Sequence, residues 1–106
     1  MATFKATYTQ VTVRSGGQAI QPVMDGKGAT RLTDLTTSGT SQIVQSGGSD
    51  FEAPFAGYIT MFANGAVNVQ IAASPTAAAT AGFALQSGER LELAVEAGDK
   101  IAVIDA

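Results

Sequence analysis

The residues whose types could take part in catalysis are three glutamates near the C-terminal end, Glu89, Glu92 and Glu96. Two carboxyl groups can hydrolyse a glycosidic bond when they lie at a set separation and one of them sits in an apolar pocket. In an extended chain Glu92 and Glu96 share one face, and the apolar residues around them lie on the opposite face. This pattern is typical of a solvated strand surface, so we do not interpret the glutamates as a catalytic pair.

The chain of 106 residues contains no histidine and no cysteine. Histidine is the usual general base and the commonest transition-metal ligand, and cysteine supplies thiol nucleophiles and thiolate ligands. Residues 25–28, with the sequence DGKG, lack the spaced oxygen ligands of a calcium loop and the Gly-Lys-Ser/Thr order of a phosphate-binding loop. We interpret them as a turn. The sequence predicts a protein that is not an enzyme and has no cofactor and no metal site.

Charge is distributed unevenly along the chain. Residues 1–31 carry four cations and one carboxylate, residues 32–106 carry two cations and eight carboxylates, and the net charge is −3. A general nucleic-acid-binding protein is expected to be basic, so no nucleic-acid partner is predicted. The basic N-terminal segment reflects either chance among few charges or docking on an acidic surface, which belongs to a neighbouring subunit or to another protein. No apolar run approaches the roughly 20 residues that cross a membrane, so no membrane partner is predicted.

These side chains must be positioned by strands, and the clearest strand signal runs from Tyr58 to Ile71. Two apolar runs flank Asn64-Gly65, and Asn-Gly is the preferred pair for a two-residue hairpin turn because both positions need a positive φ. Apolar and polar residues alternate in the second run, which indicates one buried and one solvated face. We therefore predict a β-hairpin over residues 58–71.

Further short strands are predicted on both sides of this stretch. Residues 3–13 and 40–45 are rich in side chains that suit a pleated surface. Residues 91–95 alternate in hydropathy, residues 100–104 form a last strand with apolar side chains on both faces, and residues 73–82 form a loop of small side chains in this prediction. Short strands with frequent turns and no amphipathic helix predict an all-β fold, a small antiparallel β-sandwich or jelly-roll-like domain with an extended N-terminal segment.

One domain is expected from the length of the chain. Residues 1–38 are interpreted as an N-terminal strand followed by an irregular arm, and residues 39–106 as the sandwich core. The apolar face of the first strand changes between Tyr8 and Val11. This change predicts a β-bulge, or a strand that passes from one partner to another.

The N-terminal arm supplies most of the predicted partner interface. An extended arm that pairs with another chain gains main-chain hydrogen bonds without needing a pocket. In this hypothesis two aromatic residues anchor the arm and three cations set its register on the partner. The anchors are Phe4 and Tyr8, and the cations are Lys5, Arg14 and Arg31.

Three further residues complete the predicted interface: Phe51, Phe55 and Ile104. The two phenylalanines are expected to plug one end of the core, with an exposed binding patch as the alternative. Ile104 belongs to a final strand that is apolar on both faces, so we expect it to be covered by the sheet on one side and by a neighbour on the other.

Residues 57–106 resemble a group of small virion proteins of tailed bacteriophages. The matching features are the run GYITMFANGAVNVQI, the following ASPTAAATAG, and the block LQSGERLELAVEAGDKIAVI, in which a Leu-x-x-Gly leads into two final strands joined by a Gly-Asp-Lys turn. The resemblance is to head decoration (cement) proteins and related structural proteins of the virion, and it covers roughly half of the chain.

The resemblance implies a small β-sandwich, often trimeric, that binds the assembled capsid and stabilises it. The partners would be the major capsid protein or another virion protein and further copies of the chain in a homotrimer. The protein would be made in the host cytoplasm and located on the capsid surface. Two alternatives remain open: a tail, fibre-base or connector subunit, and a carbohydrate-binding β-sandwich module with Tyr58 and Phe62 as the stacking face.

Overall fold

The chain folds almost entirely into β-strands. The computed structural model describes residues 1–16 and 19–106, and for residues 12–16 and 19–28 it describes the path of the backbone. Within those residues the chain forms eleven strands and no helix. The strands are β1 (Thr3–Gly16), β2 (Ala19–Arg31), β3 (Leu35–Thr36), β4 (Gln42–Ile43), β5 (Gln45–Ser46), β6 (Ser49–Asp50), β7 (Gly57–Ala63), β8 (Val67–Ala72), β9 (Phe83–Leu85), β10 (Arg90–Val95) and β11 (Lys100–Asp105).

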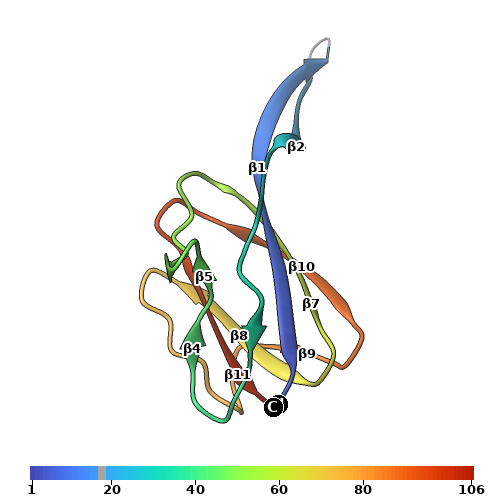
Figure 1. Ribbon diagram of the computed structural model, residues 1–106. Coiled ribbons are helices and arrows are strands. Elements are labelled where there is room, and N and C mark those ends of the chain that lie inside the picture. Colours follow the sequence, from blue (N-terminus) through green and yellow to red (C-terminus); the bar gives the residue numbers. More distant parts are fainter. Residues whose placement is uncertain (17–18) are drawn as a thin grey trace.

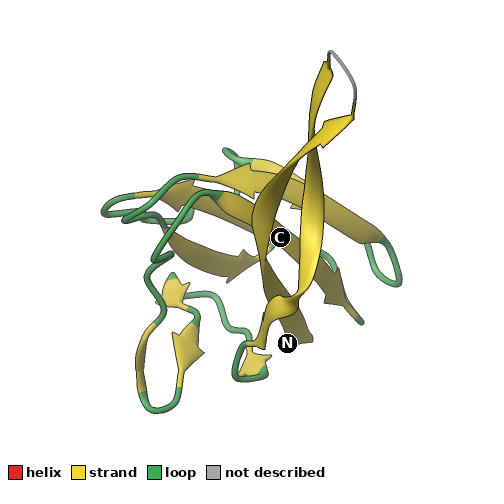
Figure 2. Ribbon diagram, turned by 90° about the horizontal axis from the view of Figure 1, so that it is seen from above, coloured by secondary structure: helices red, strands yellow, loops and turns green. Residues whose placement is uncertain are grey.

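The strands form two antiparallel sheets that pack against each other (Figure 1, Figure 2). Sheet A has the order β10-β7-β1-β2, and β3 pairs with the beginning of β1. Sheet B has the order β4-β11-β8-β9, and β5 and β6 form a separate small hairpin. This architecture confirms the predicted all-β fold and the small antiparallel β-sandwich.

The core lies between the sheets and is built from alternate residues of their strands. Phe4, Ile59 and Met61 of sheet A and Val69 and Ile101 of sheet B are buried in a single cluster, each with at most 1% of its surface exposed. Successive side chains of a strand point to opposite faces. The residues that lie between these core positions therefore form the outer faces of the sandwich.

The predicted hairpin over residues 58–71 is wrong in its pairing, although both of its strands are present. β7 pairs with β1 and β10 in sheet A, whereas β8 pairs with β11 and β9 in sheet B. The Asn64-Gly65 connection therefore crosses from one sheet to the other. The alternation that indicated a hairpin is explained equally well by two strands that face one core from opposite sides.

Asn64 and Gly65 hold this crossing through contacts with the N-terminus. The backbone N–H of Thr3 donates to Asn64 Oδ1 at 2.8 Å, and the N–H of Asn64 donates to the carbonyl oxygen of Thr3 at 3.3 Å. Gly65 does not adopt a positive φ. A Cβ atom at Gly65 would lie 2.9 Å from the Cβ of Ala2. The glycine is therefore required for close packing rather than for a tight turn.

The first half of β1 is a central strand of sheet A rather than an arm. It pairs with β7 from Phe4 to Gln10, and its alternate residues point into the core. Phe4 is fully buried and Tyr8 is 3% exposed. Residues 19–31, interpreted as part of an irregular arm, form the regular strand β2.

The predicted bulge in β1 is confirmed. The register between β1 and β2 shifts between Thr9 and Val11, because Thr9 opposes Ala29 whereas Val11 opposes Met24. Residues 25–28, predicted as a turn, lie within β2. They are the residues of β2 between Met24 and Ala29, where β1 has only Gln10 between Val11 and Thr9. The glycines of this run therefore lie at a bulge within a strand. Glycine is common at bulges as well as in turns.

Beyond the bulge, β1 and β2 leave the sandwich as a two-stranded ribbon. The pairs run from Val11 opposite Met24 to Gly16 opposite Ala19, and β7 pairs with β1 only as far as Gln10. This projecting ribbon stands clear of the two sheets (Figure 1). It contributes to the elongated shape of the molecule, which measures 49 × 26 × 21 Å along its principal axes.

The loop between β8 and β9, predicted over residues 73–82, covers part of the outer face of sheet B. Asn68 Nδ2 donates to the carbonyl oxygen of Ala79 at 2.7 Å, and the N–H of Ala77 donates to Ser41 Oγ at 2.9 Å. Ala77 is buried, and so is Ala102, an outward-facing residue of β11. The chain therefore covers much of the apolar outer face of β11 by itself.

The two ends of the chain meet at Thr37, a fully buried polar residue. The N–H of Ala2 donates to Thr37 Oγ1 at 2.8 Å, and the Thr37 hydroxyl donates to the carboxylate of Asp105. The N-terminal ammonium group lies 3.2 Å from Asp105 Oδ2. The hydrogen bond from Thr37 holds the pKa of Asp105 below its usual range, and the ammonium group acts in the same direction.

We expect this cluster to make part of the stability of the protein depend on pH. Because the folded pKa of Asp105 is lowered, its contribution is fully present above the unfolded pKa of about 3.9 and is lost as the pH falls through the lower folded value. The variants Asp105→Asn and Thr37→Val should both lose stability at pH 7 and show a flatter decline below about pH 4. Urea unfolding between pH 7 and pH 2.5 measures this. A Thr37→Val variant with the wild-type pH profile would show that another group causes the effect.

Candidate functional site

The outer face of sheet A gathers three of the six cations of the chain. The antiparallel register places Lys5 of β1 beside Phe62 of β7, and Phe62 beside Arg90 of β10. Arg31 of β2 stands opposite Thr7 of β1 in the neighbouring row. All of these residues alternate with core residues, so they point outward. The outward residues Lys5, Thr7, Arg31, Thr60, Phe62 and Arg90 are called the basic face below.

The basic face forms a shallow hollow of about 440 Å³ that is lined by all six of its residues. Phe62 is 38% exposed, a large value for an aromatic side chain in a strand. The threonine hydroxyls offer hydrogen bonds, and the ammonium and guanidinium groups attract carboxylates and other oxyanions. Such a surface suits a ligand or partner that presents negative charge around an apolar contact.

Two carboxylates moderate the positive charge of this face. Asp34 Oδ1 lies 3.0 Å from Arg31 Nη2, and Asp34 Oδ2 lies 3.9 Å from Lys5 Nζ. Glu92 Oε2 accepts a hydrogen bond from Thr60 Oγ1 at 3.2 Å. For Arg90, no carboxylate of the described residues lies within 4.0 Å. The guanidinium of Arg90 is therefore the cation of this face that is best placed to pair with another molecule.

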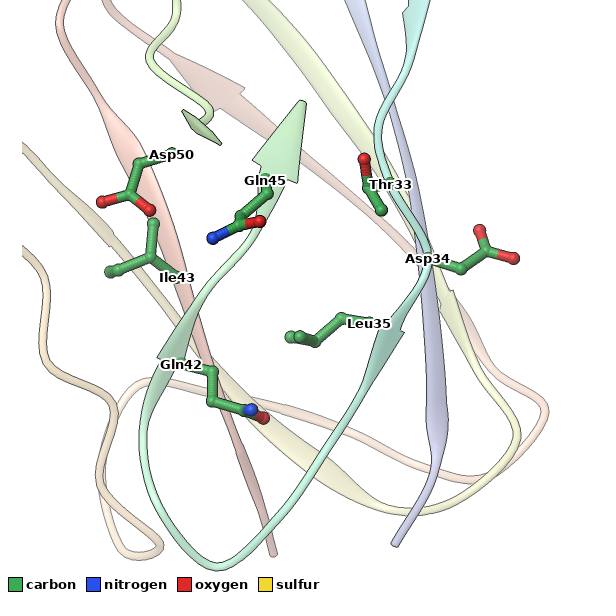
Figure 3. A pocket seen from close by; sticks show the side chains of 7 residues that line it. All are labelled: Thr33, Asp34, Leu35, Gln42, Ile43, Gln45 and Asp50. Carbon is green, nitrogen blue, oxygen red and sulfur yellow. The ribbon is translucent and has the colours of Figure 1, made fainter. Parts of the chain in front are cut away.

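A second hollow, of about 430 Å³, opens between β3 and the β4–β5 segment at one side of the sandwich (Figure 3). Leu35 and Gln42 point toward each other across it, whereas the carboxylate of Asp34 points away. Asp50 lies on the far side of β4 from Asp34, so the two carboxylates do not face one another. Gln42 Oε1 is buried without a hydrogen-bond partner. The hollow therefore has a polar lining but no pair of acids arranged for proton transfer.

A third hollow, of about 370 Å³, lies at the opposite side of the sandwich, between β10 and the β8–β9 edge. Its walls are the apolar side chains of Ile71, Phe83 and Leu93, and Glu96 and Asp99 lie at its rim. Phe83 is 55% exposed. We call this feature the apolar slot. It exposes more hydrophobic surface than the other two hollows, and surfaces of this kind mark places where another molecule binds.

Two further searches covered the described part of the chain, one for metal-binding clusters and one for membrane-spanning helices. In residues 1–16 and 19–106 no group of three or more histidine, cysteine, aspartate or glutamate side chains is arranged to hold a metal ion. The same residues contain no helix of the length and apolar character needed to cross a membrane.

The basic face contains two of the residues predicted for a partner interface, Lys5 and Arg31. Phe4 and Tyr8, predicted as its anchors, are instead buried in the core of this chain, because they occupy the inward positions of a central strand. Arg14 lies in the projecting ribbon, and its side chain is outside the described part of the structure.

The remaining predicted interface residues are divided between the core and the surface. Phe51 is buried, and its ring centroid lies 5.4 Å from that of Tyr8, so it plugs the core as expected. Phe55 is 58% exposed, and only its carbonyl oxygen contributes to the fold, by accepting a hydrogen bond from the Tyr8 hydroxyl at 2.8 Å. Ile104 is half-buried beside Asn68, close to the covering loop of the same chain.

The sequence alone did not bring Arg90 and Phe62 together with Lys5. The three residues lie on strands far apart in the chain, and only the order β10-β7-β1 makes them neighbours. A signal was nevertheless present, since each of them alternates with core residues. Knowledge of the strand order would have been sufficient to predict the basic face.

Comparisons with protein-family models, with curated proteins and with solved structures found no match for this chain. The function proposed below is therefore supported by the geometry of the chain and by the resemblance of residues 57–106 to phage virion proteins.

Proposed function

We propose that this protein is a non-enzymatic structural protein of a tailed-phage particle. In this proposal it attaches to the capsid surface as a homotrimer and stabilises the shell, as a decoration (cement) protein does. The major capsid protein or another virion protein is the partner. The protein is made in the host cytoplasm and becomes part of the virion.

The main structural support for this proposal is the projecting ribbon. From Thr12 to Gly16, β1 pairs with β2 and with no other strand of the described structure, whereas the N–H of Val11 still donates to the carbonyl oxygen of Ala56 at 3.5 Å. A two-stranded hairpin is marginally stable in water, and additional strands or a packed surface stabilise it. Its outer edges present unpaired backbone groups, which another chain can extend by β-strand addition. A ribbon of this kind is well suited to lock a small protein onto a larger assembly.

The basic face supports the same proposal in a second way. The chain is acidic overall, yet Lys5, Arg31 and Arg90 lie together on one surface. Such asymmetry orients a protein as it approaches an acidic surface, which in a homo-oligomer belongs to a second copy of the chain, and it contributes more to association rate and specificity than to affinity. Many weak contacts repeated over a capsid lattice then give tight overall attachment.

Removal of the projecting ribbon should abolish attachment and leave the sandwich folded. Replacing residues 12–23 by Asn-Gly would close the Val11–Met24 pair with a two-residue turn. We expect the wild-type protein to co-sediment with purified capsids of the phage that carries its gene, and the shortened variant to bind at least about tenfold more weakly because its edge contacts are lost. Circular dichroism provides the control for folding. Equal binding by both proteins would remove the ribbon from the proposal, and no binding by the wild type would refute attachment to capsids.

A tail, fibre-base or connector subunit is the alternative within the same class. The same sedimentation experiment with purified tails separates it from a capsid protein. A carbohydrate-binding module is favoured by one observation: Tyr58 and Phe62 lie on the same face of β7 with Thr60 between them. Titration with neutral oligosaccharides, followed by NMR, tests this alternative. Shifts of both aromatic rings at millimolar sugar would support it.

A further inference from the structure

Phe62 stands on the basic face as an exposed aromatic residue flanked by cations. It is 38% exposed, with Lys5 on one side of it and Arg90 on the other in a single cross-strand row. Neighbouring strands of a sheet are about 4.8 Å apart, so the backbones that carry the two cations are separated by about 10 Å. Aromatic residues, phenylalanine among them, and arginine are enriched at the cores of protein interfaces.

The apolar slot has the opposite character. Ile71, Phe83 and Leu93 form its walls, and Glu96 and Asp99 lie at its rim. A third carboxylate is near, because a Cβ atom at Gly98 would lie 3.9 Å from Glu52 Oε1. The slot is therefore an apolar recess beside a cluster of negative charge.

We propose that the basic face of one copy of this chain docks on the apolar slot of a second copy. Phe62 enters the slot between Phe83 and Leu93 of the next copy, and Arg90 and Lys5 pair with the carboxylates of Glu96 and Glu52. The match rests on complementary charge and on the burial of two exposed aromatic rings at one contact. The slot volume of about 370 Å³ is sufficient for a phenylalanine side chain.

Charge also determines the direction of this contact. Two basic faces would bring cations against cations, and two slots would bring carboxylates against carboxylates, so symmetric pairing of either surface is disfavoured. A face-to-slot contact that occurs once between two copies is head-to-tail, and such contacts produce closed rings or open filaments. Arg90 is the first residue of β10 and Glu96 follows the last, and the slot opens at the side of the sandwich rather than on its face, so the two surfaces of one copy point in different directions.

This inference rests on the homo-oligomer in the proposed function and not on attachment to capsids. Sedimentation velocity of the full chain over a range of concentrations tests it. Phe62→Ala and Phe83→Ala should each weaken self-association at least about tenfold, as expected for an aromatic residue at the centre of an interface. Phe55→Ala is the matched control, because Phe55 is 58% exposed and lies on neither surface. Its association should equal that of the wild type.

Reciprocal charge reversal provides the sharper experiment. Arg90→Glu and Glu96→Lys should each weaken self-association, whereas the double variant that carries both substitutions should associate again, because every reversed basic face then meets a reversed slot. Asp50→Lys, which reverses an exposed charge away from both surfaces, should have no effect.

Three results would overturn the inference: a wild-type protein that stays monomeric at all concentrations, an oligomer that neither aromatic substitution weakens, or a double variant that fails to recover association. A monomer that still pellets with capsids would overturn this inference and the homotrimer, and would leave attachment to capsids standing. A ring that ignores capsids would overturn the proposed attachment alone.

Discussion

Replacing Phe4 by alanine should lower the free energy of unfolding by about 3–5 kcal/mol, the range for truncation of a buried phenylalanine. Phe4 is fully buried and packs in the core cluster with Ile59 and Met61. The substitution removes the aromatic ring from the space between the sheets and leaves a cavity that β1, a central strand, cannot close by moving. Urea unfolding followed by circular dichroism measures the loss.

The control for this prediction is Phe55→Ala. Phe55 is 58% exposed, so its truncation should change stability by no more than about 0.5 kcal/mol. Because Phe4→Ala could unfold the protein completely, Phe4→Leu serves as a second variant, with a smaller loss that remains measurable. If Phe4→Ala left stability unchanged and weakened only the binding of a partner, the interpretation of this segment as a partner-binding arm would be restored.

Replacing Gly57 by alanine should be almost as damaging, although it adds a single methyl group. A Cβ atom at Gly57 would overlap the carbonyl oxygen of Thr9 and lie 3.1 Å from Cε1 of Tyr8. The oxygen belongs to the backbone of the paired strand β1, so β1 and β7 would have to separate where they are joined. Overpacking of this kind costs about 1–3 kcal/mol and occasionally more. We expect a loss of about 2–4 kcal/mol because the obstacle is backbone.

Gly39→Ala provides the matched comparison. A Cβ atom there would meet nothing within 4 Å, and Gly39 does not adopt a positive φ. Such a substitution stabilises a protein by about 0.4–1 kcal/mol, because it restricts the unfolded chain. Thermal unfolding of the two variants should therefore shift in opposite directions. Equal shifts would show that the approach of β7 to β1 is looser than the geometry indicates.

Most of the strands were predictable from the sequence, because alternation of apolar and polar residues is a local property. β8 and β10 follow it closely, and the change of face between Tyr8 and Val11 correctly indicated a bulge. The alternation with a period of two residues indicates which side chains are buried. It does not report which strands are neighbours.

Strand pairing was the part that could not be predicted. Asn64-Gly65 has the local preference for a tight hairpin, yet hydrogen bonds to Thr3 and contact with Ala2 stabilise a crossing between the sheets instead. Tertiary contacts with the N-terminus thus outweigh the local preference of the turn. For the same reason β1 was interpreted as an arm, since its main partner, β7, is remote in the sequence.

The candidate site was partly predictable. Lys5 and Arg31 were identified from the basic character of the N-terminal segment, and Phe62 was considered as a stacking residue. Arg90 was not identified, because it lies in the acidic half of the chain and joins the basic face only through β10. The exposure of Phe83 could not be predicted either, since an apolar residue in a short strand is usually expected in a core.

The order of the strands has a consequence for how the protein folds during synthesis. Phe4 pairs with Ala63, and Ile43 pairs with Ala102, so 59 residues separate the partners in each case. β1 emerges first from the ribosome and must wait for β7, and sheet B has its centre in β11. Folds dominated by such remote pairings form slowly, on the order of milliseconds to seconds. While translation continues, β1 and β8 each keep an edge that any neighbouring nascent chain can occupy. The sandwich closes only when Lys100–Asp105 has emerged. When several ribosomes translate one message close together, their unfinished chains can therefore pair with one another through these open edges, and this pairing competes with correct folding.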